Sequence, residues 1–395
     1  MPRLSRRAEQ MPASPIRRLV PYADAAQERG IHVHYLNIGQ PDIPTPPEMI
    51  RAYQRYDETV LAYGPSQGLP EMRAAVAADY VKRGLSISPD QVTTCFGGSE
   101  AVTFALAAVA DPGDEVVVPE PFYANYAGFA TLLGASVKPV AASAQDGFHL
   151  PSDEALDAAV GPRTRAFVFC SPGNPTGTVY TPEEMARIGR FAQRHDLMII
   201  SDEVYRDFAY DGVKVTSALE LPDADDRVIV IDSVSKKYSA CGARVGFVVT
   251  RSASVLDAVM RMSFARLCPA TVDQHAAIAA YQTPDSYFDK VRTEYKLRRD
   301  CLVDGLNSID GVHSYRPEGA FYTVATFPVD DIDRFAVWLL TDFDHNGETV
   351  LIAPATGFYA TPGLGKDQAR IAYVLGVPFL QSSVEILRAG LQAFR

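Results

Sequence analysis

A regular alternation of short apolar runs with helical segments in the middle of the chain restricts the possible folds most. Six runs rich in β-branched and aromatic residues are candidate strands, at residues 91–96, 115–118, 165–170, 197–200, 228–232 and 246–250. Helical patterns lie between them, as at 101–110 and 182–195, and Thr181 and Pro182 suit the N-cap and the first position of the second helix. This alternation predicts an α/β fold in which helices cover a largely parallel sheet.

The two ends of the chain have different patterns. Residues 1–47 are rich in proline and predict an arm that also contributes to a small domain. Residues 48–285 would form the large domain, and residues 286–395 predict a smaller α+β domain. In the smaller domain we expect helices at 288–309 and 383–394 and strands at 319–327 and 369–374.

Composition excludes several classes of protein. Of the 395 residues, 47% are hydrophobic and 22% are charged, which is globular usage. The net charge of −11 disfavours binding to nucleic acids or to an anionic membrane surface, and no apolar run is long enough to span a bilayer. The basic N-terminus lacks the apolar core of a signal peptide. The five cysteines are odd in number and form no CxxC motif, so we expect reduced thiols in a cytoplasmic protein and no metal site.

Unusual residues follow the candidate strands, where ligands bind in open α/β sheets. The first strand is followed by Gly97-Gly98-Ser99-Glu100, which suits either an anion at a helix start or a tight turn. The third is followed by the loop at residues 171–177, SPGNPTG, in which the Asn174–Pro175 bond is a candidate for the cis form. Asn174 would then direct its amide into a cleft or simply belong to a rigid turn.

Charged residues follow the fourth and fifth strands. Asp202 comes directly after a buried run, so it needs a cationic partner or a helix N-terminus to cap. Lys236 stands where partial desolvation makes a lysine a usable amine nucleophile, whereas we expect Lys237 to be solvated. Arg244 offers a fork for phosphate. With Tyr205, these groups on one rim suit a pyridine aldehyde that carries a phosphate.

The stretch SVSKKYSACGARVGF resembles the Ser-x-Ser-Lys and Gly-x-Arg-x-Gly motifs of the class I/II pyridoxal-phosphate aminotransferases of fold type I, the aspartate-aminotransferase-like family. In that family the arginine stands eight residues after the cofactor lysine, which selects Lys236 over Lys237. Further stretches support the resemblance from Ile16 to the C-terminus: LNIGQPDIPTP, YGPSQGLPEMR, FGGSEA, SPGNPTG, SDEVY, PEGAFY and RIAYV.

The resemblance implies a role for each matching residue. Lys236 would form the aldimine with pyridoxal 5′-phosphate and move the substrate proton, while Asp202 pairs with the pyridinium nitrogen. Asn174 and Tyr205 would form hydrogen bonds with the ring oxygen of the cofactor, and Tyr123 would stack on its pyridine ring. The resemblance assigns the phosphate to Gly98, Ser99, Ser233, Arg244, the backbone N–H of Glu100, and Tyr63 from the partner of a homodimer. Arg370 would clamp the substrate α-carboxylate, with Gly39 and Asn174 beside it.

The implied reaction is ping-pong transfer of an amino group, through an aldimine and a ketimine, from an L-amino acid to a 2-oxo acid such as 2-oxoglutarate. One alternative is β-elimination by a carbon–sulfur lyase on the same scaffold. Another is a transcription regulator, which needs a helix-turn-helix that the first 15 residues are too short to supply.

The resemblance leaves the substrate open. Ser99 stands where one dicarboxylate-specific group has a lysine, and the stretch CPATVDQHAA lacks the arginine of another. Arg17, Arg18 and Arg266 remain as cations that would have to act by a different route. We therefore expect neutral or aromatic amino donors with 2-oxoglutarate as the acceptor.

Overall fold

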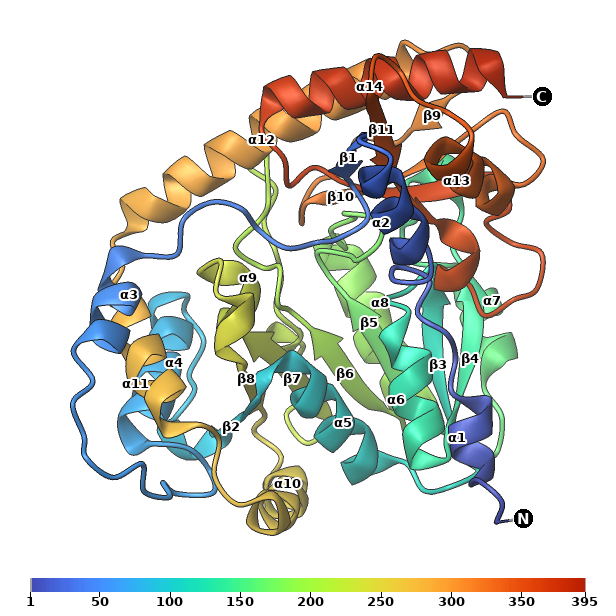
Figure 1. Ribbon diagram of the computed structural model, residues 1–395. Coiled ribbons are helices and arrows are strands. Elements are labelled where there is room, and N and C mark those ends of the chain that lie inside the picture. Colours follow the sequence, from blue (N-terminus) through green and yellow to red (C-terminus); the bar gives the residue numbers. More distant parts are fainter. Residues whose placement is uncertain (1, 395) are drawn as a thin grey trace.

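The computed structural model describes residues 2–394 and is built around a seven-stranded sheet (Figure 1). The strand order is β2-β8-β7-β6-β5-β3-β4. The strands are β2 Val92–Phe96, β3 Glu115–Glu120, β4 Ser136–Ala141, β5 Thr164–Cys170, β6 Met198–Asp202, β7 Val228–Ser233 and β8 Val245–Val249. The strand β8 runs antiparallel to β2 and β7, and all other neighbouring pairs in this sheet are parallel. The prediction of a largely parallel sheet is therefore confirmed.

Helices cover both faces of the sheet, because successive side chains of a strand point to opposite sides. Val228 and Val230 of β7 pack in one apolar cluster, and Ile229 and Ile231 pack in another on the opposite face. The first cluster takes side chains from α3 Pro47–Gln54, α4 Pro70–Lys82, α7 Asp153–Ala159, α8 Pro182–Arg194 and α11 Thr271–Ala280. The second takes them from α5 Gly97–Val109, α6 Asn125–Leu133 and α10 Ala253–Arg266.

A smaller layer holds the two ends of the chain together. It contains the four-stranded sheet β12-β13-β10-β9 and the parallel pair β1–β11. The strands are β1 His32–Tyr35, β9 His313–Ser314, β10 Tyr322–Thr326, β11 Glu348–Leu351, β12 Ala353–Pro354 and β13 Gln368–Ala372. The helices are α2 Val20–Glu28, α12 Asp285–Asn307, α13 Ile332–Thr341 and α14 Val377–Ala393. The short helix α1 Arg6–Gln10 lies instead against α6 of the large layer (Figure 1). Figure 1 shows α12 and α14 side by side along one edge of the molecule.

Residues from before α3 belong to the same apolar cluster as the C-terminal part. Leu19, Ala23 and Leu36 pack there with side chains of α12, α13 and α14. The assignment of residues 1–47 to an arm and part of the small domain stays a prediction. The boundaries at residues 47 and 285 stay a prediction.

Three of the elements that differ from the sequence-based expectation have a clear physical reason. The strand β4 was not expected, because Lys138 and Pro139 interrupt its apolar pattern; both fit at the edge of a sheet, where one side of the strand is unpaired. The helix α5 begins at Gly97, within the stretch that also reads as a turn. The last helix begins at Val377, six residues before the expected start, and has Pro378 in its first turn, where no backbone N–H is needed.

The start of α8 follows the prediction closely. Thr181 Oγ1 accepts a hydrogen bond from the Glu184 backbone N–H, and the Thr181 N–H donates to Glu184 Oε2 at 2.7 Å. All five cysteines carry free thiols. Across residues 2–394 no helix combines the length and apolar character needed to cross a membrane.

Candidate active site

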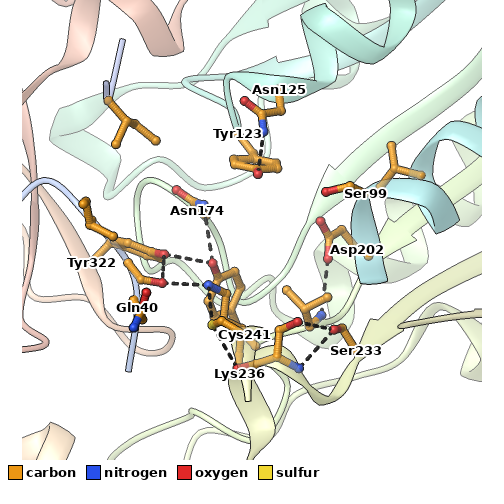
Figure 2. A pocket seen from close by; sticks show the side chains of 18 of the residues that line it. Gln40, Ser99, Tyr123, Asn125, Asn174, Asp202, Ser233, Lys236, Cys241 and Tyr322 are labelled. Atoms are coloured by element: carbon orange, nitrogen blue, oxygen red, sulfur yellow. Dashed lines mark hydrogen bonds between the residues drawn. The ribbon is translucent and has the colours of Figure 1, made fainter. Parts of the chain in front are cut away.

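A cavity of about 520 Å³ lies at the carboxyl ends of the central strands, between them and the smaller layer (Figure 2). It brings together most of the residues singled out from the sequence. Those that line it are Gly39, Gly98, Ser99, Tyr123, Asn174, Asp202, Tyr205, Ser233, Lys236, Arg244 and Arg370. Residues after β2, β3, β5, β6 and β7 therefore meet at one rim, as expected for an open α/β sheet.

Part of the cavity is lined by the backbone of Gly98 and Ser99 at the start of α5, by Ser233 and by Arg244; we call this part the cradle. A Cβ atom at Gly97, whose φ is +76°, would lie 2.5 Å from Arg244 Nη2, so this position requires glycine. Gly246 is equally restricted, since its Cβ would lie 2.3 Å from the Gly97 carbonyl carbon. The close approach places the Arg244 guanidinium against the first turn of α5, where the backbone N–H groups of Gly98 and Ser99 are not used within the helix. Cation and N–H groups together suit an anion.

Asp202 lies at the C-terminal end of β6 and is only 6% exposed. The Tyr126 hydroxyl group donates a hydrogen bond to Asp202 Oδ2 at 2.7 Å, and the Val204 N–H donates one to Oδ1 at 3.3 Å. Burial raises the pKa of Asp202 to about 6, against the opposing effect of these two hydrogen bonds. Among the described residues no cation forms an ion pair with this carboxylate.

Lys236 follows β7 in the short helix α9 Val234–Lys237, and its amine reaches into the cavity. Nζ donates to the Gly39 carbonyl at 2.7 Å and lies 3.7 Å from Cys241 Sγ (Figure 2). A side chain at Gly39 is not possible, because its Cβ would lie 1.6 Å from the hydroxyl oxygen of Tyr322. The absence of a Cβ at Gly39 thus admits both the lysine amine and the Tyr322 ring.

Arg370 lies on β13 and is 1% exposed. Its Nη1 donates to Asn174 Oδ1 at 3.0 Å, and its Nη2 donates to the Asn37 carbonyl. No carboxylate pairs with it within residues 2–394, and its buried Nε has no hydrogen-bond partner there. Burial lowers the pKa of the Arg370 guanidinium. A buried guanidinium that meets only neutral oxygens has capacity for an anion.

Asn174 connects Arg370 to the tyrosines of the cavity. Its Nδ2 donates to the Tyr205 hydroxyl at 3.5 Å, and the Tyr205 and Tyr322 hydroxyl oxygens lie 2.9 Å apart. The Asn174–Pro175 peptide bond is cis, as the sequence predicts. Tyr123 accepts a hydrogen bond from Asn125 Nδ2 at 2.7 Å, and burial raises the pKa of Tyr123 to about 12.

The expectation that Lys237 is solvated is wrong. Its side chain is 3% exposed, and its Nζ lies 2.8 Å from Asp79 Oδ1 of α4. The ammonium also lies 5.0, 5.3 and 5.6 Å from the ring centroids of Tyr281, Tyr238 and Phe288. The sequence places Lys237 beside Lys236, but in a helical turn consecutive side chains point in different directions.

Two predicted site residues lie outside the cavity. Glu100 accepts a hydrogen bond from the Phe96 N–H at 2.8 Å and approaches Arg266 at 3.5 Å, so its carboxylate points away from the cradle. Tyr63 is 83% exposed in the single chain. The roles given to the Glu100 backbone N–H and to Tyr63 stay predictions.

Several residues of the site were not singled out from the sequence, and four of them contact its central groups. Tyr322 and Cys241 line the cavity, whereas Tyr126 and Asn37 hold Asp202 and Arg370. Tyr322 is part of PEGAFY and Asn37 is part of LNIGQPDIPTP, so the motifs contained both without distinguishing them. Residues 2–394 contain no group of three His, Cys, Asp or Glu side chains suited to hold a metal ion.

Comparison with known proteins identifies the family. The family model for aminotransferase class I and II matches residues 31–364. The aromatic-amino-acid aminotransferase 2 of Thermococcus litoralis is 32% identical over 97% of this chain and 96% of its own, and the LL-diaminopimelate aminotransferase of Desulforudis audaxviator is 35% identical over 95% and 97%. A crystal structure of aspartate aminotransferase from Thermotoga maritima matches with a TM-score of 0.90 and 31% identity, and the match covers 99% of this chain and 100% of that one. The chain therefore belongs to the class I and II aminotransferases and is a pyridoxal-phosphate-dependent enzyme of fold type I.

Proposed function

We propose that the enzyme moves an amino group from an L-amino acid to a 2-oxo acid, with 2-oxoglutarate as the acceptor. One observation carries the proposal: two buried and uncompensated charges of opposite sign, Asp202 and Arg370, face the cavity into which the Lys236 amine reaches. Unpaired buried charges are costly, so both are expected to find partners in the bound cofactor and substrate.

The residues present fit pyridoxal 5′-phosphate. The cavity is lined by Gly98, Ser99, Ser233 and Arg244, and the close approach of Arg244 to Gly97 places a guanidinium beside the start of α5, where a phosphate would be bound. The residues that would hold the phosphate are Gly98, Ser99, Glu100 through its N–H, Ser233 and Arg244. Asp202 would meet the ring nitrogen, Asn174 and Tyr205 the ring oxygen, and Tyr123 the ring face.

When bound, the cofactor supplies an electron sink for the substrate Cα. The protein supplies the proton transfer: Lys236 Nζ accepts the proton from the substrate Cα and later returns it. Its position beside the Gly39 carbonyl keeps the amine in the cavity. Asp202, once a cation lies against it, stays ionised and holds that cation protonated. Arg370 binds the α-carboxylate and so orients the Cα–H bond toward Lys236, with the Gly39 backbone at the same wall.

Product stoichiometry tests the reaction. With an L-amino acid and no oxo acid, an aminotransferase releases one 2-oxo acid per active site and then stops, whereas addition of 2-oxoglutarate restarts turnover. A carbon–sulfur lyase would instead form pyruvate and ammonia continuously from a cysteine-type substrate. Lys236→Ala should abolish both the burst and the turnover. Continuous pyruvate without a burst would overturn the proposal in favour of the lyase.

We also propose a cytoplasmic homodimer in which Tyr63 reaches the partner's phosphate cradle. The support is the exposure of apolar side chains around Tyr63, since Val60 and Leu61 are each 71% exposed. Sedimentation at micromolar protein should give twice the chain mass, and Tyr63→Phe should weaken cofactor binding. A monomeric mass would exclude the arrangement.

A further inference from the structure

Three arginines are candidates for a second substrate carboxylate, and the structure separates them. Arg18 forms an ion pair with Asp333. Arg266 lies 3.5 Å from Glu100 and donates to the carbonyls of Ser66 and Thr94 at 3.3 and 3.1 Å. Neither lines the cavity. Arg17 does line it, and within residues 2–394 its guanidinium forms no hydrogen bond or ion pair.

Contacts on both sides of Arg17 fix the backbone that carries it. The Ile16 carbonyl accepts a hydrogen bond from Asn37 Nδ2 at 2.9 Å, and the Asn37 carbonyl in turn accepts from Arg370. The preceding Pro15 packs so closely on Gly357 that a Cβ at Gly357 would lie 2.1 Å from Pro15 Cβ. The following Arg18 is held by Asp333. Arg17 is thus tied, through Ile16 and Asn37, to the arginine assigned to the α-carboxylate.

We propose that Arg17 binds the distal carboxylate of a dicarboxylic substrate, 2-oxoglutarate and the glutamate formed from it, while Arg370 binds the α-carboxylate. The inference rests on the proposed function. Arg17 would supply the positive charge that dicarboxylate-specific relatives place either at the position of Ser99 or in the stretch that reads CPATVDQHAA here. A guanidinium matches a carboxylate with two parallel hydrogen bonds.

The exposure of Arg17 explains how one cavity accepts both acidic and neutral side chains. The buried Arg370 cannot leave its site, but the Arg17 side chain is exposed and its four-bond stem is free to turn toward water. Ile16, Ile38 and Phe129 also line the cavity and supply apolar surface for a substrate side chain without a charge. Recognition of the distal carboxylate therefore adds to binding without excluding an amino acid that lacks it.

The test compares Arg17→Gln with Arg6→Gln in the holoenzyme. Arg6 lies in α1 of the same arm, is exposed and does not line the cavity, so its variant removes the same charge elsewhere. Isothermal titration calorimetry measures the Kd of glutarate and of pentanoate, two unreactive acids of equal length that differ by one carboxylate.

We expect Arg17→Gln to weaken glutarate binding about tenfold, because a charge-assisted hydrogen bond is lost, and to change the Kd of pentanoate less than twofold. Arg6→Gln should leave both values unchanged. Equal glutarate binding by Arg17→Gln and the unmodified enzyme, or equal weakening of both acids, would overturn the inference.

A burst of 2-oxoglutarate from glutamate in the unmodified enzyme is measured separately. If that burst occurs and Arg17→Gln keeps the same preference for glutamate over norvaline, only the role of Arg17 fails. If no amino acid gives a burst, the proposed function itself fails.

Discussion

The hydroxyl group of Tyr126 donates a 2.7 Å hydrogen bond to Oδ2 of Asp202, and both residues are buried beneath the cavity. Burial raises the pKa of Asp202, and this hydrogen bond lowers it, because the bond stabilises the ionised carboxylate. Tyr126 therefore acts on the cofactor site through another residue.

Replacement of Tyr126 by Phe should weaken cofactor binding about tenfold, since a hydrogen bond to a charged group contributes about 1.5 kcal/mol. Equilibrium titration of the cofactor-free enzyme with pyridoxal 5′-phosphate measures the effect. Tyr180→Phe is the matched control, because Tyr180 is also a buried tyrosine but does not contact Asp202. Identical affinities in the two variants would show that the bond to Asp202 has no influence on the cofactor.

Asp202 also predicts a pH dependence of stability in the cofactor-free enzyme. Its pKa in the folded protein is about 6, above the usual value of 3.8, so the folded protein holds more protons than the unfolded chain between these values. The free energy of unfolding must then fall as pH rises through this window, by roughly 3 kcal/mol.

Asp202→Asn removes this contribution, whereas the similarly raised pKa of Glu203 affects both proteins alike. Urea unfolding of the two cofactor-free proteins from pH 4 to pH 7 should therefore show the unmodified protein losing more stability. Parallel curves would mean that Asp202 titrates normally. In the unmodified protein saturated with cofactor, the fall in the free energy of unfolding with pH should become smaller. The reason is that a cation against Asp202 offsets the cost of ionising its carboxyl group.

Arg370→Lys should lower kcat/KM for amino acids at least about a hundredfold, because lysine keeps the charge but loses the fork that meets a carboxylate with two bonds. The loss should appear mainly as a higher KM. The visible absorption of bound cofactor should remain and would show that the site is intact. The control is Arg29→Lys, which should retain full activity. The Arg29 guanidinium forms a hydrogen bond with the Leu340 carbonyl and does not line the cavity. A KM unchanged in Arg370→Lys would exclude the clamp.

Lys237→Met should lower the free energy of unfolding by roughly 3 kcal/mol, because the Asp79 side chain, which is only 14% exposed, loses one of its cations and keeps Arg83 and Arg206. Chemical denaturation measures the loss, and the exposed Lys290 offers the control variant Lys290→Met. Equal stability of the two variants would show that the buried pair contributes nothing.

The rim of the central sheet could be predicted from the sequence because its residues follow directly after recognisable strands. Asp202, Lys236 and Asn174 are examples, since each is placed by the strand that precedes it. Arg370 and Gly39 came only from the family resemblance, because the smaller layer brings them to the rim from distant parts of the chain.

Lys237 shows where local reasoning fails. Its burial depends on Asp79 of α4 and on Phe288 of α12, which tertiary packing brings to it. A lysine pair after a strand has the same local pattern whether its second member is solvated or enclosed. Likewise, the edge strand β4 forms despite Lys138 and Pro139, because pairing with β3 outweighs their poor strand propensity.

The cavity takes its walls from the rim of the central sheet, from the N-terminal segment, and from Tyr322 and Arg370 of the smaller layer, which are under different constraints. The sheet rim carries the groups assigned to the cofactor, whereas Ser14, Ile16, Arg17 and residues 38–40 come from the N-terminal segment. Gly39 cannot be varied, because its carbonyl accepts a hydrogen bond from Lys236, but Ser14 and Arg17 hold none of the groups assigned to the cofactor. Evolution can therefore vary these two side chains while the rim is held constant. Relatives named for aromatic and for LL-diaminopimelate substrates share about a third of their residues with this chain. For the engineer, residues 14–17 offer a short contiguous segment at which selectivity can be varied without touching the residues that carry the chemistry.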